Sequence, residues 1–162
     1  MTIAEMGLRI IAIGIGATAV MDAWLMLLKR LGVPSQSFAM LGRWIGHWRK
    51  GQWRHDRIAA APAIRGELAL GWSAHYAIGI AFAVIPVLAC GSAWLGAPSF
   101  GPALLTGVAT VAAPLLVMQP AMGAGIASSR TPTPRRNVLK SLATHAVFGL
   151  GLYLAASAIR AV

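Results

Sequence analysis

Charged residues are scarce in this chain, and acidic residues are the scarcest of them. Asp, Glu, Lys and Arg make up 11% of the 162 residues, whereas they make up about 25% of a typical soluble domain. A soluble domain of this length would need far more polar surface to cover its core. The composition therefore excludes that class and indicates one integral membrane domain over residues 1–162.

Cysteine pairs and catalytic motifs are also missing. Cys90 is the only cysteine, so no disulfide can form within the chain, and the redox compartment stays open. The sequence contains neither GxSxG nor HExxH, and no other arrangement of a nucleophile beside a base. An enzyme is therefore the less favoured class of function.

The chain does contain four long apolar stretches, at residues 8–28, 68–90, 102–119 and 138–159. A helix needs about 20 residues to cross a hydrocarbon core about 30 Å thick. The stretches lack the apolar/polar alternation of a barrel strand, and only helices and closed barrels satisfy their backbone inside lipid. They predict an all-α fold, a four-helix transmembrane bundle.

The basic residues lie mainly on one side of these stretches. Eight Lys and Arg residues fall in residues 29–65 and four in residues 130–140, which makes twelve of the fourteen. Because positively charged loops stay in the cytoplasm, we expect the basic loops 29–65 and 120–137 there. Both termini are then periplasmic, in a bacterial inner membrane. The position of these cations, beside apolar runs and among tryptophans, argues against nucleic acid as a partner.

The first basic loop contains an amphipathic pattern. Apolar residues recur there at spacings of three and four: Phe38, Leu41, Ile45 and Trp48. Pro34 with Ser35 or Ser37 could begin a helix. We expect this interfacial helix over residues 38–53, in the headgroup region and against anionic lipid at the inner face. The alternative is a mobile loop whose cations only set the topology.

A short motif occurs twice, at an offset of 70 residues. Both copies read P-x2-R-x9-H-x3-G, at Pro62, Arg65, His75 and Gly79 and at Pro132, Arg135, His145 and Gly149. A true repeat would make the bundle two helical hairpins related by an axis along the membrane normal, as in transporters with parallel repeats. The alternative is convergence, because Pro, Arg and Gly are common at these places in membrane helices.

Three ionisable residues lie within the apolar stretches: Asp22, His75 and His145. Such residues cost about 2.5–3.5 kcal/mol each on insertion scales, and they normally face the bundle interior. By the helical rise, Asp22 lies about 10 Å from the cytoplasmic end of its stretch, and both histidines lie about 12 Å from theirs. We therefore expect the three side chains to meet at one level. The other histidines, His47 and His55, are expected at the surface of the first basic loop.

Several ligands would suit this cluster. Two neutral imidazoles and a carboxylate suit a divalent metal ion or a proton, with Asp22 as the counter-charge and Glu67 at the inner entrance. Alternatively, His75 and His145 could ligate one b-type haem from opposite faces, in an electron carrier.

Two further expectations concern partners. The polar residues could serve only helix packing through hydrogen bonds, in a structural or assembly subunit of a membrane complex. Four helices are few for a solitary transporter, so we expect a homo-oligomer or a membrane-complex partner in any case.

The chain also resembles a known family. The resemblance rests on motifs in the second and fourth stretches and in the loop before the fourth: Gly66-Glu67, Leu70-Gly71-Trp72, His75-Tyr76, Arg130-Thr131-Pro132, Ser141-Leu142, His145 and Phe148 to Tyr153. In these motifs the chain is similar, over nearly its whole length, to the small bacterial polytopic membrane proteins grouped as domain of unknown function 2938. The resemblance implies a four-helix membrane form. It implies no activity, so no residue takes a role from it.

Overall fold

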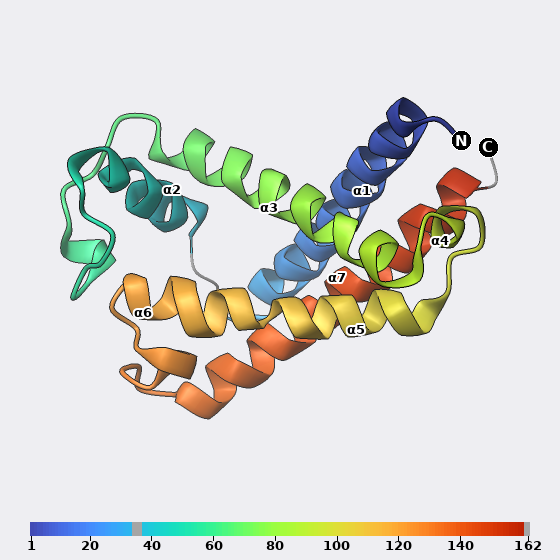
Figure 1. Ribbon diagram of the computed structural model, residues 1–162. Coiled ribbons are helices and arrows are strands. Elements are labelled where there is room, and N and C mark those ends of the chain that lie inside the picture. Colours follow the sequence, from blue (N-terminus) through green and yellow to red (C-terminus); the bar gives the residue numbers. More distant parts are fainter. Residues whose placement is uncertain (34–36, 161–162) are drawn as a thin grey trace. The chain divides into compact units, whose positions relative to one another are not determined.

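The computed structural model of the protein describes residues 1–33 and 37–160 (Figure 1). Over these residues the chain is helical and has no strand. Four segments are long and apolar enough to cross a membrane: α1 (Ile3–Arg30), α3 (Glu67–Cys90), Phe100–Ala121 and α7 (Pro134–Arg160). The predicted all-α fold with four membrane helices is therefore confirmed, and each predicted stretch lies inside one of these segments.

The third segment is built from three elements. They are α5 (Phe100–Thr110), the π-helical segment η3 (Ala113–Met118) and α6 (Gln119–Ala121). Pro114, the second residue of η3, has no backbone N–H to donate, and π-helical turns occur as local insertions of this kind within α-helices. The remaining described elements are short: α2 (Phe38–His47), η1 (Trp48–Lys50), η2 (Ile58–Ala60), α4 (Ala93–Gly96) and η4 (Ile126–Ser128).

The first helix has strong signals at both ends. Thr2 Oγ1 accepts a hydrogen bond from the Glu5 backbone N–H at 3.2 Å, and Glu5 Oε2 accepts one from the Thr2 N–H at 2.8 Å. This reciprocal capping box satisfies two N–H groups at the start of α1. Lys29 and Arg30 occupy the last turn, where positive charge complements the helix dipole.

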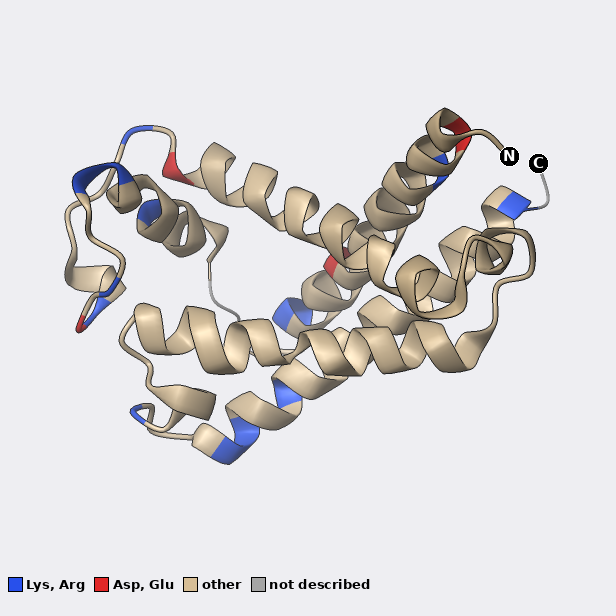
Figure 2. Ribbon diagram, in the orientation of Figure 1, with Lys and Arg blue, Asp and Glu red and all other residues tan. Residues whose placement is uncertain are grey.

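The described chain divides into two compact units. Unit 1 lies within residues 1–33, 76–110 and 143–160, and unit 2 within residues 37–75 and 111–142. Figure 2 shows long portions of the membrane helices without charge, while Lys and Arg gather in and around the loops of unit 2.

Unit 1 has a core formed by α1, α3, α4, α5 and α7. Its buried apolar residues are Ile13, Ala17, Met21, Ala83, Val87, Trp94, Leu95, Ala103, Phe148, Leu152 and Ala156. Glycines let the helices approach closely, as small residues do in membrane bundles. A Cβ built on Gly107 of α5 would lie 2.6 Å from the Gly149 Cα of α7, so these two backbones are in direct contact.

In unit 2, α2 packs antiparallel against the first turns of α3. A Cβ built on Gly42 would lie 2.6 Å from the Gly71 backbone nitrogen. Toward the start of α2, the Phe38 ring lies 4.4 Å from the Trp72 ring, measured between centroids. Glycine at positions 42 and 71 therefore permits a backbone contact that any side chain would obstruct.

The predicted interfacial helix is confirmed as a helix but ends earlier than expected. α2 begins at Phe38, where Ser37 Oγ accepts a hydrogen bond from the Ala39 N–H at 3.2 Å. It ends at His47, and after η1 Gly51 takes a left-handed conformation at φ 71°, which stops a helix. The proposed starting residues 34 and 35 lie outside the described residues, and the location of α2 in the headgroup region stays a prediction.

The contact between α5 and α7 gives a stability prediction. Replacing Gly107 with valine places a side chain against backbone atoms that cannot move aside, and overpacking of this kind costs about 1–3 kcal/mol. We expect Gly107→Val to lower the midpoint of thermal unfolding in detergent by several degrees, measured by tryptophan fluorescence.

Gly101 provides the matched control for this variant, because it lies on the same helix and has open space at its Cβ position. Gly101→Val should keep the wild-type midpoint. Equal midpoints for the two variants would contradict the close contact between α5 and α7.

Candidate functional site

Within unit 1, the membrane helix α1 presents a buried carboxylate to α3. Asp22 is 8% exposed, and the Tyr76 hydroxyl donates a hydrogen bond to Asp22 Oδ2 at 2.9 Å. The sequence singled out Asp22 but not its partner. Tyr76 directly follows His75, and nothing in its spacing indicated that it faces α1.

His145 on α7 is hydrogen-bonded to α5 in the same unit. Thr110 Oγ1 lies 3.0 Å from His145 Nδ1 and 2.7 Å from the Gly107 carbonyl oxygen. A hydroxyl has one hydrogen to donate, and a carbonyl can only accept. Thr110 therefore donates to Gly107 and accepts from the Nδ1–H of His145, which makes Nε2 the basic nitrogen of the neutral ring.

A third hydrogen bond in unit 1 joins α1 to α7. The Trp24 indole N–H donates to Thr144 Oγ1 at 3.2 Å. Trp24 lies two positions after Asp22, and Thr144 directly precedes His145. The polar residues predicted for α1 and α7 therefore lie beside a further polar contact, formed by residues that the sequence analysis did not select.

His75 belongs to unit 2, where it lies among aromatic rings. Its ring centroid is 4.4 Å from that of Phe38 and 6.0 Å from that of Trp72. Within each unit, the described residues contain no group of three or more His, Cys, Asp and Glu side chains that could hold a metal ion. Because Asp22 and His145 belong to unit 1, joint ligation of a metal ion or a haem with His75 stays a prediction.

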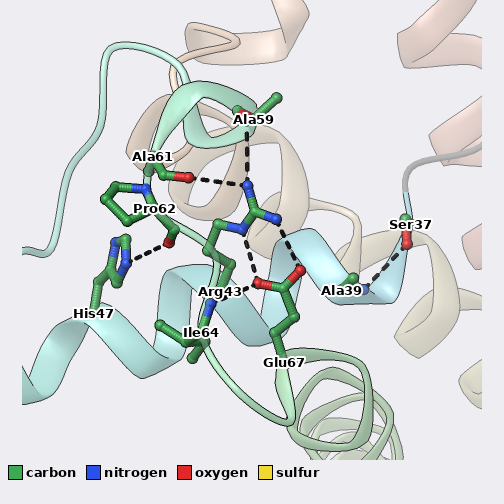
Figure 3. Close-up of polar contacts among 9 residues, drawn as sticks. All are labelled: Ser37, Ala39, Arg43, His47, Ala59, Ala61, Pro62, Ile64 and Glu67. Atoms are coloured by element: carbon green, nitrogen blue, oxygen red, sulfur yellow. Dashed lines mark hydrogen bonds and ion pairs between the residues drawn. The ribbon is translucent and has the colours of Figure 1, made fainter.

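Glu67 forms the main ion pair described in unit 2 (Figure 3). Arg43 Nε and Nη2 donate to Glu67 Oε2 and Oε1, each at 2.8 Å, and the Ile64 N–H donates to Oε2 at 3.1 Å. Arg43 Nη1 also donates to the carbonyls of Ala61 at 3.0 Å and Ala59 at 3.4 Å. Glu67 thus fastens the loop to α2, and its predicted role at the entrance is untested.

Arginine suits this pairing because its five donors match a carboxylate in a planar fork. The hydrogen bond to Glu67 raises the pKa of Arg43, although burial acts in the opposite direction. Arg43 therefore stays charged at neutral pH.

Two histidines in unit 2 contact each other. His47 Nδ1 lies 3.4 Å from His55 Nε2, and His47 Nε2 lies 3.0 Å from the Pro62 carbonyl oxygen. The expectation that His47 lies at the surface is wrong, since it is 2% exposed. It is the last residue of α2, and its ring is covered where the loop returns past it. Burial, followed by the neighbouring His47, lowers the pKa of His55.

The four apolar segments and the polar contacts between membrane helices define a helical membrane protein. The chain belongs to the family described as Protein of unknown function (DUF2938), whose family model matches residues 11–159. This match confirms the resemblance seen in the sequence. No curated protein and no solved structure matches the chain.

The loop held by Arg43 gives a prediction for limited proteolysis. Replacing Arg43 with glutamine removes the charge-assisted hydrogen bonds to Glu67 and the bonds to two loop carbonyls. We expect trypsin to cleave after Arg57 several-fold faster in Arg43→Gln than in the wild-type protein, measured by mass spectrometry in lipid nanodiscs.

Arg49→Gln is the control, because Arg49 is exposed and removing it changes the loop charge equally. It should leave cleavage after Arg57 unchanged. Equal acceleration in both variants would show that charge alone, and not the ion pair, protects the loop.

Proposed function

We propose that this protein binds a proton inside its membrane helices and acts in proton-coupled binding or transport, with a metal ion as the alternative ligand. The hydrogen bond between Asp22 and Tyr76 carries this proposal. Asp22 is a buried carboxylate on an apolar helix, and the Tyr76 hydroxyl donates to it. Such residues in membrane helices commonly mark ion pathways and proton relays. A carboxyl needs no second ligand to bind a proton, whereas a metal ion needs several donors.

His145 is the second proton-binding group of the proposed function. Its Nδ1–H is held by Thr110, so the proton that makes the ring cationic would enter at Nε2. Histidine changes its charge near neutral pH more readily than any other side chain. Asp22 on α1 and His145 on α7 would then be two proton-binding groups within unit 1.

The proposed setting is a bacterial inner membrane with both termini in the periplasm. Exposed cations in unit 2 support it: Arg49, Lys50, Arg54, Arg57, Arg65, Arg130, Arg135 and Arg136. Their charge suits the anionic lipid of a cytoplasmic leaflet. We further propose that the chain works as a homo-oligomer or with a membrane partner, since four membrane helices enclose little space for a pathway.

Infrared spectroscopy tests the proton site directly. The chain has only four Asp and Glu side chains, so the carbonyl stretch of a protonated carboxyl can be assigned by single substitutions. In pH-difference spectra of the reconstituted protein, we expect a protonated-carboxyl band that Asp22→Asn abolishes. Tyr76→Phe should shift the band, because it removes the hydroxyl that donates to the carboxylate.

Asp56→Asn is the control, because Asp56 is exposed outside the membrane helices and its loss should leave the band of the buried carboxyl in place. A band that persists unchanged in Asp22→Asn would refute proton binding at this residue.

Reporter fusions test the orientation. With both termini in the periplasm, alkaline phosphatase fused to the C-terminus should be active, and a fluorescent protein exported there through the general secretion route should stay dark. A fusion inserted after Gly51 should give the reverse pattern, because that basic loop is then cytoplasmic. An active phosphatase after Gly51 would overturn the proposed topology.

A further inference from the structure

The histidine pair of unit 2 lies outside the membrane helices and has no role in the proposed function. His47 is the last residue of α2, and His55 follows in the loop. Their facing nitrogens, His47 Nδ1 and His55 Nε2, are 3.4 Å apart, and their ring centroids are 4.9 Å apart. Two ring nitrogens brought together in this way need a proton or a metal ion between them.

The second nitrogen of His47 fixes its protonation. Nε2 lies 3.0 Å from the Pro62 carbonyl oxygen, and a carbonyl can only accept a hydrogen bond. Nε2 therefore carries the hydrogen, and in the neutral ring Nδ1 presents its lone pair to His55. Histidines that bind metal ions usually donate their other N–H to a carbonyl or carboxylate in this manner.

The separation of the facing nitrogens matches the span that one metal ion imposes on two imidazole ligands. Two nitrogens on one tetrahedral zinc ion are about 3.3–3.4 Å apart, given Zn–N bonds of about 2.0–2.1 Å. The observed 3.4 Å equals this span, and it is also within reach of an N–H···N hydrogen bond from His55, which a bound ion would replace.

Both histidines are held in place by backbone contacts in the same unit. His47 is 2% exposed. The loop that carries His55 is bonded to the end of the third membrane segment, because the His55 N–H donates to the Ala121 carbonyl at 2.8 Å and the Ile58 N–H to the Met122 carbonyl at 3.1 Å. The two nitrogens are therefore already close together before an ion binds.

We propose that His47 and His55 form a two-nitrogen site for a divalent transition metal ion such as zinc. Imidazole suits zinc, copper and nickel. Two protein ligands leave two tetrahedral positions for water or for a ligand brought with the ion. Exposed Arg49, Lys50 and Arg54 flank the pair and weaken binding of a cation, but solvent and salt screen them over about 8 Å.

Zinc titration of the reconstituted full chain tests this site. The protein is purified with a tag free of histidine, in a Cys90→Ser background that removes the exposed thiol. Calorimetry should show one zinc ion per chain, and His55→Gln should weaken its binding at least tenfold. His47→Gln should do the same, but this buried residue also supports α2, so the half-buried His55 gives the cleaner result.

His145→Gln is the matched control, because it removes an imidazole from the membrane helices and leaves the loop pair intact. It should keep wild-type zinc affinity, whereas loss of affinity in His145→Gln alone would place the ion at the membrane site and overturn this proposal. Absence of zinc binding to the wild-type protein at 100-fold excess over the chain would overturn the proposal. Unchanged affinity in His55→Gln would overturn it equally.

Discussion

A hydrocarbon layer offers no water, so every polar group on a membrane helix must find its partner within the protein. Unit 1 meets this constraint with side chains from different helices. Three side-chain hydrogen bonds join α1 to α3, α1 to α7, and α5 to α7. These bonds are directional, unlike the contacts of the apolar core, and so they fix which faces of the helices meet. The residues proposed to bind a proton are thus the same residues that align the helices.

The few acidic residues each have a defined place in a chain of net charge +10. Glu5 completes the capping box at the start of α1, Asp22 accepts from Tyr76, and Glu67 binds Arg43. Asp56 is exposed in the basic loop. Asp22 accepts from a phenol within the membrane helices, and its burial on an apolar helix makes it the strongest candidate for a functional acid.

Sequence patterns predicted the membrane helices well, because length and apolar composition alone decide whether a segment can cross lipid. They predicted α2 through its helical spacing but placed its end too late, because Gly51, a residue typical of helix ends, takes a left-handed conformation after η1. They also missed the burial of His47 and the pairing of Tyr76 with Asp22. Those features depend on which distant segments pack together, and no local spacing contains that information.

Small residues and polar residues act together at the contact between α5 and α7. Gly107 and Gly149 remove the side chains that would separate the two backbones. Thr110, one turn after Gly107, can then reach His145, one turn before Gly149. Because the same hydroxyl donates to the Gly107 carbonyl, it can only accept from His145 Nδ1. The close approach at Gly107 therefore lets Thr110 reach His145, and the hydrogen bond of Thr110 to the Gly107 carbonyl determines which nitrogen of His145 carries the hydrogen.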